Sequence, residues 1–365
     1  MKKTIGLITC NYSSKNTEIS NDVRPIASMP FLGRYRLVDF ALSNLMNCGI
    51  RTVGMIMPFN YRSLIDHIGS GKAWGLDRKN GGLFILPGSA FGTSRTGARF
   101  LLRDLMTNRI YLERSTSDYV IYSSANFVYN FDLDKMGEYH IESGADITVL
   151  CNEAQGYNAD ATAFEVDDDG RVVGVHNSVN HGDVQSLDCF IISRKKLMDM
   201  LDWYAATDYL DIFEALRSDY GHVRVQTYFF DGYARGIFDK NSLYQANMDA
   251  LNPDVAAKLF PDGNIKTKAH DTAPAKFEIG SSVTNSMISA GCRIYGTVTG
   301  SVLGRKVIVE PGAVIRDSLV MQGCIVKSGA VVDRAIVDRD NIIPNDTELH
   351  GTPENIFVRK KYTQS

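Results

Sequence analysis

The sequence SVLGRKVIVEPGAVIRD, residues 301–317, is followed without a gap by SLVMQGCIVKSGAVVDR, residues 318–334, and by AIVDRDNIIPNDTELHG, residues 335–351. The three segments repeat with a period of 17 residues, and residues 286–300 resemble a shorter preceding copy. Aliphatic β-forming residues recur about every six positions in each copy. This pattern predicts a parallel β-helix with a triangular cross-section, in which aliphatic side chains stack inward.

Alignment of the copies places like residues in shared columns. One column holds three isoleucines, which are Ile308, Ile325 and Ile342. Gly312 shares another column with Gly329, and each glycine precedes an alanine in a pair that suits a tight corner. A meander of short hairpins is the alternative, and the absence of gaps between the copies favours the β-helix.

Upstream of the repeat, apolar segments alternate between the spacing of strands and that of helices. Strands are expected at residues 3–9, 52–57, 119–123 and 146–151, and helices at 38–48, 61–68 and 134–143. This alternation predicts a mostly parallel sheet with helices on both faces. Residues 69–97 are rich in Gly, Ser and Asn, and we expect a long functional loop there. We divide the chain into an α/β domain at 1–251, a proline-containing linker at 252–277 and a β-helix domain at 278–365.

The composition is that of a globular protein, with 365 residues, of which 44% are hydrophobic and 22% charged. The formal net charge is −3, so we expect no whole-protein basic field for nucleic acid. Apolar runs fall far short of the roughly 20 residues that span a bilayer, so no membrane partner is expected. The six cysteines are scattered without a C-x-x-C pair, which favours a reducing compartment and predicts a cytoplasmic protein.

Two groups of arginines are candidates for binding a phosphorylated ligand. Arg24, Arg34 and Arg36 cluster in an expected loop. Arginine binds phosphate through two parallel N–H groups, so these side chains suit a phosphorylated ligand. Ion pairs with Asp22 or Asp39 explain them equally well.

The second group is Arg95, Arg99 and Arg103, which share one face if their segment is helical. A solvated basic face and a phosphate contact are the two interpretations of this group.

The segment FLGRYRLVDFALSN, residues 31–44, closely resembles a signature of ADP-glucose pyrophosphorylase, which is glucose-1-phosphate adenylyltransferase. The resemblance continues at residues 47–51, 119–121, 244–249 and 274–277. Members of this family convert ATP and glucose 1-phosphate to ADP-glucose and diphosphate for glycogen and starch. The resemblance implies a nucleotidyltransferase-like α/β domain with a mostly parallel sheet, followed by a left-handed parallel β-helix.

This chain departs from the family pattern at the positions that carry catalysis. Asn16 stands where the family has an arginine on the nucleotide phosphates. Asn126 and Gly236 stand where the family has the two aspartates that hold the catalytic metal. In the family motif R-A-K-P-A the arginine survives as Arg24 and the lysine is lost. Adenylyl transfer depends on Mg²⁺ and cationic groups to offset charge on the phosphates, so these losses remove most of the expected stabilisation.

The pattern resembles the second, D-type subunit that accompanies a catalytic C-type subunit in some bacteria. The resemblance implies a regulatory role in a hetero-tetramer with the catalytic subunit, or a homo-oligomer when the chain is alone. Mg²⁺ would then bind in the catalytic partner, and this chain would bind no cofactor. It also implies that Arg24 and Arg36 lie in a region that senses sugar-phosphate effectors. We therefore take Arg24, Arg34 and Arg36 as candidates for effector binding, and Arg95 and Arg99 as candidates for a substrate loop.

Two other hypotheses remain open at this point. The first is an active nucleotidyltransferase that uses other metal ligands, for example Asp132 or Asp239. The second is a hexapeptide-repeat acyltransferase or a scaffold built on the β-helix. Acyltransferases of that kind use a histidine near a subunit boundary, and His350 is the only histidine of the repeat region.

Overall fold

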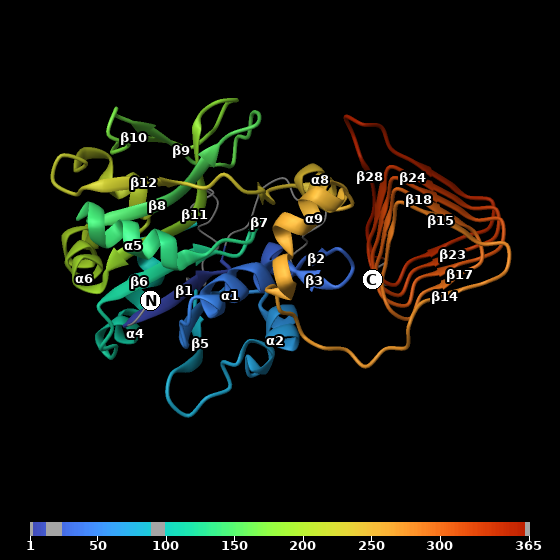
Figure 1. The fold of residues 1–365 in the computed structure, drawn as a ribbon, viewed down its shortest axis with the longest axis horizontal. Coiled ribbons are helices and arrows are strands. Elements are labelled where there is room, and N and C mark those ends of the chain that lie inside the picture. Colours follow the sequence, from blue (N-terminus) through green and yellow to red (C-terminus); the bar gives the residue numbers. More distant parts are fainter. Residues whose placement is uncertain (1–2, 12–23, 89–98, 362–365) are drawn as a thin grey trace.

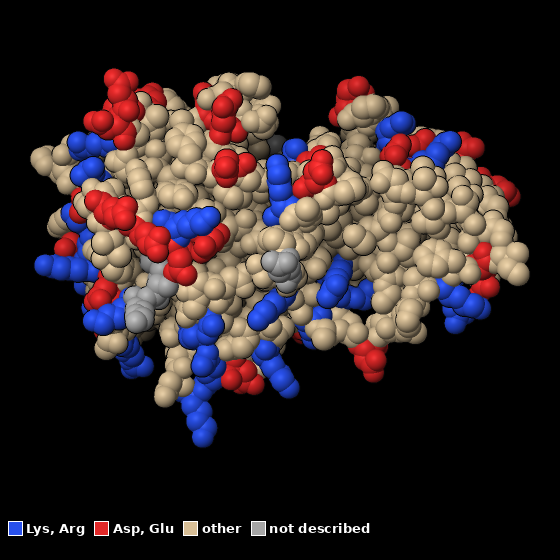
Figure 2. All heavy atoms as spheres, in the orientation of Figure 1, with Lys and Arg blue, Asp and Glu red and all other residues tan. Residues whose placement is uncertain are grey.

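The computed structural model describes residues 3–11, 24–88 and 99–361. Figure 1 shows two bodies, an α/β body in the blue-to-yellow part of the ribbon and a triangular stack of short strands in the orange-to-red part. Figure 2 shows Lys and Arg interspersed with Asp and Glu across the face drawn. Within the described residues, no helix has the length and apolar character to cross a membrane.

The α/β body is built on a mixed sheet. Its strands are β1 (Thr4–Thr9), β4 (Thr52–Met57), β5 (Gly82–Pro87), β6 (Tyr119–Ser124), β8 (Ile147–Glu153), β9 (Ala163–Val166), β10 (Val172–His176), β11 (Val184–Ser193) and β12 (Val225–Phe229). Seven of them run in the order β12-β8-β11-β6-β1-β4-β5, and the β9–β10 hairpin is joined to β11. The pairs β12–β8, β6–β1, β1–β4 and β4–β5 are parallel, as predicted, whereas β11 is antiparallel to both of its neighbours β6 and β8.

Helices cover both faces of this sheet. They are α1 (Leu37–Asn47), α2 (Arg62–Ile68), α3 (Leu102–Thr107), α4 (Arg109–Glu113), α5 (Leu133–Ser143), α6 (Arg194–Trp203), α7 (Ile212–Ala215), α8 (Lys240–Asp249) and α9 (Pro253–Leu259). Single turns of 3₁₀-helix lie at η1 (Ile26–Ser28), η2 (Lys72–Trp74), η4 (Ala205–Thr207), η5 (Leu216–Ser218) and η6 (Pro261–Gly263). Along β1, Ile8 belongs to the core cluster under α1, α2, α5 and α8, while Ile5 and Leu7 belong to the cluster under α3, α4, α6 and α7. Because successive side chains of a strand point to opposite faces, a strand buried on both faces is apolar throughout.

Two short strand pairs complete this body. The first pair is β2 (Pro30–Phe31) with β3 (Tyr35–Arg36), and the second is β7 (Phe127–Tyr129) with β13 (Ala234–Gly236). The β2–β3 pair leads directly into α1. Asp39 in the first turn of α1 accepts a hydrogen bond from the Arg36 backbone N–H at 3.0 Å, which helps to fix where the helix begins.

The repeat region forms a parallel β-helix with three sheets. One sheet contains β14 (Lys276–Phe277), β17 (Arg293–Ile294), β20 (Ile308–Val309), β23 (Ile325–Val326) and β26 (Ile342–Ile343). The next contains β15 (Ser282–Thr284), β18 (Thr297–Thr299), β21 (Val314–Arg316), β24 (Val331–Asp333) and β27 (Glu348–His350). The third contains β16 (Met287–Ile288), β19 (Val302–Leu303), β22 (Leu319–Val320), β25 (Ala335–Val337) and β28 (Phe357–Arg359).

The predicted repeat period is confirmed by the pairing of these strands. Ile308 pairs with Ile325 and Ile325 with Ile342, in parallel register. Val309 and Val326 in the adjacent column are fully buried inside the stack, whereas the isoleucine column points outward and Ile342 is 57% exposed. Inward stacking is therefore correct for the valine column and wrong for the isoleucine column, because neighbouring residues of one strand face opposite sides.

The β-helix packs against the α/β body through its third sheet. Outward side chains of that sheet, Val302, Leu319 and Ile336, are buried and join the core cluster that contains α1. Gly33, in the β2–β3 turn, has a φ of +61° and lies so close to the β-helix that a Cβ there would be 2.3 Å from the Ser289 Oγ. The two bodies therefore share one continuous apolar core and are not joined by a tether alone.

Three sequence-based expectations differ in detail from the structure. The expected loop at residues 69–97 contains η2 and the edge strand β5, and residues 89–98 lie outside the described part. The expected linker at 252–277 contains α9 and η6, and its last two residues form β14 of the β-helix. The shared arginine face, expected only if the segment were helical, does not form at Arg99, because α3 begins at Leu102.

Candidate functional site

The two positions at which the resemblance places metal-binding aspartates lie side by side. Asn126 connects β6 to β7, and Gly236 is the last residue of β13. Gly236 pairs with Phe127 across the β7–β13 ladder, and the Ile237 N–H donates to the Asn126 carbonyl at 2.7 Å. The structure thus brings Asn126 and Gly236 together, although 110 positions separate them in the sequence (236 − 126).

Aromatic rings fill the space that a side chain at position 236 would need. A Cβ on Gly236 would lie 2.2 Å from Cε2 of Phe238 and 2.9 Å from Cζ of Phe127. Both rings are buried and meet edge to face, with centroids 5.6 Å apart. Real Cβ atoms do not approach other atoms this closely, so an aspartate here would require the Phe238 ring to move.

Arg99 supplies a buried positive charge beside these rings. Its guanidinium carbon lies 5.7 Å from the centre of the Phe238 ring. Its Nε lies 2.5 Å from Oδ2 of Asp188, and its other nitrogens donate to the Asp160 carbonyl at 2.7 Å and the Thr162 hydroxyl at 2.5 Å. Burial raises the pKa of Asp188, and the adjacent Arg99 opposes that rise. Arg99 is therefore an internal counter-ion, neither a solvated residue nor a member of a helical face.

The residues at this position do not fit a Mg²⁺ ion. Asn126 is 2% exposed, and neither side-chain atom of its amide has a hydrogen-bond partner among the described residues. Gly236 offers no ligand atom, and Asp188 is neutralised by Arg99. Asp132 and Asp239, the alternative ligands, cap the N-termini of α5 and α8. Within the described part of the chain, no three His, Cys, Asp or Glu side chains are grouped as metal ligands.

A second site brings together the three arginines predicted to bind an effector. Arg24, Arg34 and Arg36 line a cavity of about 130 Å³ between the α/β body and the β-helix. Arg305 and Arg339 line it from the β-helix, and we call this site the arginine cavity. It is smaller than the roughly 300–1,000 Å³ of drug-sized ligand pockets, and its size suits a phosphate group better than a nucleotide.

The two β-helix arginines were missed by reasoning from the sequence, but a signal for them was present. Arg305, Gln322 and Arg339 occupy the same column of the repeat, the fifth of 17 positions. Because equal columns stack above one another in a β-helix, they present side chains to one edge of the stack. All three line the cavity.

The arginine cavity is locally electropositive, although the whole chain is slightly acidic. Burial and, to a smaller extent, the neighbouring charges of Arg24, Arg339 and Arg305 together lower the pKa of Arg36 to about 10, against the opposing effect of Asp39. Burial and the charge of Arg34 lower the pKa of Arg305 in the same way. None of the described residues that line the cavity is acidic. The crowding of cations makes binding of an anion electrostatically favourable.

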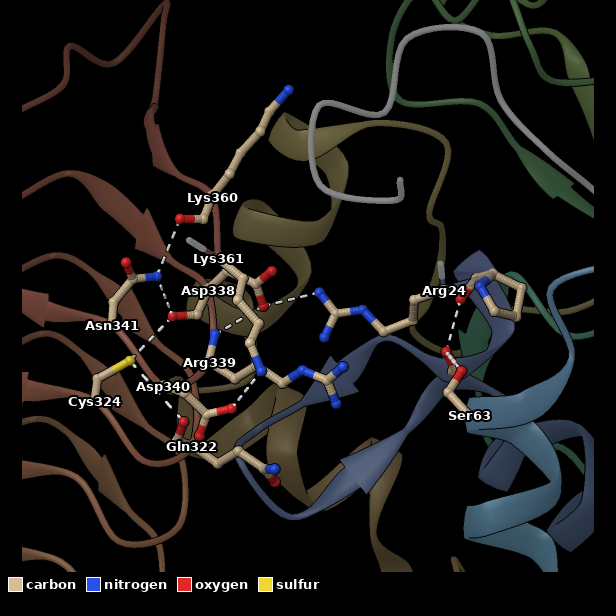
Figure 3. Close-up of polar contacts among 12 residues, drawn as sticks. Arg24, Ser63, Gln322, Cys324, Asp338, Arg339, Asp340, Asn341, Lys360 and Lys361 are labelled. Atoms are coloured by element: carbon tan, nitrogen blue, oxygen red, sulfur yellow. Dashed lines mark hydrogen bonds and ion pairs between the residues drawn. The ribbon is translucent and has the colours of Figure 1, made fainter. Parts of the chain in front are cut away.

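Contacts around the cavity show how its arginines are paired among the described residues. Arg24 pairs with Asp338 of the β-helix at 2.8 Å, as Figure 3 shows, which the sequence did not predict. The Asp39 carboxylate contacts the His67 ring at 2.6 Å and accepts from the Arg36 backbone N–H, and among the described residues no arginine side chain is hydrogen-bonded to it. Asp22 lies outside the described residues. Arg36 instead donates from Nη1 to the Ser63 carbonyl at 2.6 Å.

Other candidate residues are placed as follows. Asn16 and Arg95 lie outside the described residues. Arg103 is partly exposed and pairs with Asp208 at 2.7 Å. His350 is half exposed and contacts Glu348 at 3.0 Å.

Comparisons with known proteins add two domain matches and several relatives. Residues 18–174 match the family described as Nucleotidyl transferase, and residues 273–363 match that described as GlmU-like, C-terminal hexapeptide. The chain is 31% identical over 346 residues to glycogen biosynthesis protein GlgD of Bacillus subtilis (strain 168), covering 93% of this chain and 90% of the relative. It is 34% identical to GlgD of Geobacillus stearothermophilus, covering 86% and 83%. It is 31% identical to glucose-1-phosphate adenylyltransferase of Bacillus thuringiensis (strain Al Hakam), covering 88% and 87%.

Proposed function

Because this chain belongs to the glucose-1-phosphate adenylyltransferase family, with GlgD among its relatives, we propose that it is a catalytically degenerate, regulatory subunit of that enzyme. The relatives support a place among the nucleotidyltransferase-type proteins of glycogen synthesis. In the proposed role the chain acts in the cytoplasm and assembles with a catalytic subunit, as a hetero-tetramer. It modulates that partner, and Mg²⁺ binds in the partner alone.

The observation that carries the proposal is the filled space beside Asn126 and Gly236. Two carboxylates would be needed there, and the chain offers one buried amide and a glycine whose surroundings are occupied by Phe127 and Phe238. A single missing electrostatic group commonly reduces catalytic rates by two to three orders of magnitude, about 2.7–4 kcal/mol. The changes at both positions support loss of catalysis and not a mere change of specificity.

Arg99 supports the same conclusion from the charge balance. Its buried cation is compensated by Asp188 at 2.5 Å, so this region holds a positive charge that is already neutralised. A divalent ion beside this pair would have to compete with the Arg99 guanidinium for the Asp188 carboxylate.

The arginine cavity supports a regulatory role. Its five guanidinium groups favour an anionic ligand. A sugar phosphate carries a negative charge on its phosphate group, and its sugar ring can extend out of the small cavity. The cavity lies where the two bodies meet, so a ligand there contacts both. The presence of arginines from both bodies therefore supports an effector site at the interface between them.

Formation of ADP-glucose from ATP and glucose 1-phosphate tests the proposal. The purified chain alone should give no ADP-glucose above background. A catalytic subunit of the same organism should form a complex with it and show a changed response to a panel of sugar phosphates. The Arg339→Gln variant should weaken that response while the complex still forms. Robust ADP-glucose synthesis by the isolated chain would instead favour an active enzyme with atypical ligands.

A further inference from the structure

The side chain of Asp338 brings a carboxylate of the β-helix to the edge of the arginine cavity. Asp338 follows β25, and its Oδ1 lies 2.8 Å from Nη2 of Arg24. Both side chains are almost completely buried, at 7% and 5% exposure. The same Oδ1 accepts from the Arg339 backbone N–H at 2.8 Å, and the Asp338 carbonyl accepts from the Asn341 side chain at 2.8 Å. The carboxylate is therefore held in place by its own corner of the β-helix, as Figure 3 shows.

Three of the other arginines of the cavity contact neutral groups. Arg36 donates to the carbonyl of Ser63, Arg305 donates to the carbonyl of Arg34 at 3.1 Å, and Arg34 stacks on the ring of Tyr35. Carbonyl oxygens satisfy hydrogen-bond donors but do not cancel their charge. Arg24 is thus the cavity arginine that is hydrogen-bonded to a carboxylate among the described residues, and that carboxylate comes from the opposite body.

We propose that Asp338 is a built-in competitor for the effector, occupying Arg24 until a phosphate group displaces it. The inference rests on the proposed function, because it takes the arginine cavity to bind a phosphorylated ligand. A phosphate and a carboxylate that approach one buried guanidinium repel each other in a medium of low dielectric constant. Asp338 therefore lowers the affinity for phosphate and sets the concentration at which the site fills.

The exchange also links ligand binding to the contact between the two bodies. Arg24 belongs to the α/β body and Asp338 to the β-helix, so they form a buried ion pair across the interface. When phosphate binds Arg24, the ion pair with Asp338 is replaced by a contact with a ligand that Arg305 and Arg339 also face. Effector binding thereby alters a contact between the two bodies, because Arg24 exchanges Asp338 for the phosphate.

Replacement of Asp338 by its neutral isostere tests this competition. In Asp338→Asn, calorimetric titration with inorganic phosphate should show binding about tenfold tighter than in wild type, equivalent to about 1.4 kcal/mol. The matched control is Asp340→Asn, which removes a carboxylate two residues away that is half exposed and pairs with Lys361. The control should change phosphate affinity by less than about twofold, since a screened surface charge contributes little.

Thermal denaturation gives a second readout. Without phosphate, Asp338→Asn should melt below wild type, because Arg24 stays buried without its counter-ion. Saturating phosphate should raise the melting temperature of Asp338→Asn more than that of wild type, since the anion restores the missing charge. A third readout uses wild type alone, in case the variant does not fold. Phosphate should speed hydrogen exchange at the Arg339 amide, whose acceptor is Asp338.

The outcomes separate the competition from the site itself. If wild type binds phosphate and Asp338→Asn binds it no more tightly, the competition is overturned and the effector site stands. If neither protein binds phosphate, the effector site of the proposed function is overturned together with the competition. Where only the wild type can be studied, phosphate binding without faster exchange at Arg339 overturns the competition.

Discussion

Arg99 shows what a buried guanidinium requires of its surroundings. The side chain is 5% exposed, and removal from water costs several kcal/mol unless its donors and its charge are satisfied. Asp188 supplies the charge, while Asp160 and Thr162 supply further acceptors. The result is a rigid group of polar side chains next to Phe238, in the region where the family resemblance implied a metal.

Replacement of Gly236 by aspartate tests how firmly that region is filled. We expect Gly236→Asp to lower the free energy of unfolding by about 2–4 kcal/mol, since it overpacks the core and buries an unpaired charge. Urea denaturation followed by circular dichroism measures the change. Gly156→Asp is the matched control, because nothing lies within 4 Å of a Cβ at that exposed position. Equal stability of the two variants would show that the rings of Phe127 and Phe238 move aside at little cost in free energy.

At the scale of the element, packing between neighbours decides which side chains are buried. Helix α5 lies against β8, and His140 near its C-terminal end is buried there. The His140 Nδ1 lies 2.8 Å from the Thr148 Oγ1, and the ring meets Tyr119 edge to face. Burial, opposed in part by the charge of nearby Asp146, lowers the pKa of His140 to about 4.

This lowered pKa predicts a loss of stability in mild acid. The unfolded chain binds a proton at His140 near its ordinary pKa of 6.5, and the folded chain does so only near 4. Stability from this group is therefore complete above pH 6.5 and falls as the pH drops from 6.5 to 4, by up to about 2–3 kcal/mol. Urea denaturation at several pH values measures the slope. In His140→Gln the slope over this window should be smaller, and an unchanged slope would assign it to other groups.

The two columns of the β-helix repeat predict losses of stability of different size on truncation. Val326 is fully buried in the stack, so Val326→Ala should cost about 2 kcal/mol through lost apolar contact and a cavity. Ile342 in the outward column is 57% exposed, and Ile342→Ala should cost less than about 1 kcal/mol. Thermal denaturation of the two variants compares them. A larger cost at Ile342 would indicate that the outward column is covered, for example by another subunit.

At the scale of the whole molecule, the α/β body and the β-helix are held by one continuous core. Val302, Leu319 and Ile336 of the β-helix are buried in the same cluster as α1. The Gly33 turn fits directly against the stack, and the Arg24–Asp338 ion pair crosses the same interface. Such an apolar interface resists relative motion of domains, whereas small polar interfaces permit it.

Insertion of one methyl group at the Gly33 turn tests this close approach. A Cβ at Gly33 would lie 2.3 Å from the Ser289 Oγ and 2.7 Å from the Leu303 carbonyl oxygen. Gly33→Ala should therefore lower the free energy of unfolding by about 2–4 kcal/mol, through both the clash and the left-handed backbone. Gly75→Ala is the control, with a φ of +67° but no atom within 4 Å of its Cβ, and should cost about 1 kcal/mol. If thermal denaturation shows equal losses of stability in the two variants, the interface adjusts to the added methyl group and the expected clash is absent.

Local patterns predicted the classes of structure in both bodies. The strand at Thr52–Met57 and the helices near α1 and α5 follow from the spacing of apolar residues, which is a property of neighbours in the chain. The period of 17 residues predicted the stacking of Ile308 on Ile325, because equal copies form equal coils. The positions Asn126 and Gly236, at which the family resemblance places two aspartates, were also named from the sequence alone.

Only the tertiary structure decided the position of β11 between β6 and β8, the burial of Arg99 and the membership of the arginine cavity. Arg24 and Asp338 are 314 positions apart, and no local spacing predicts that one neutralises the other. The aromatic rings around Gly236 likewise come together only when β13 pairs with β7. Residue spacing governs elements because their hydrogen bonds are local, whereas charge pairing and the filling of space depend on which elements meet.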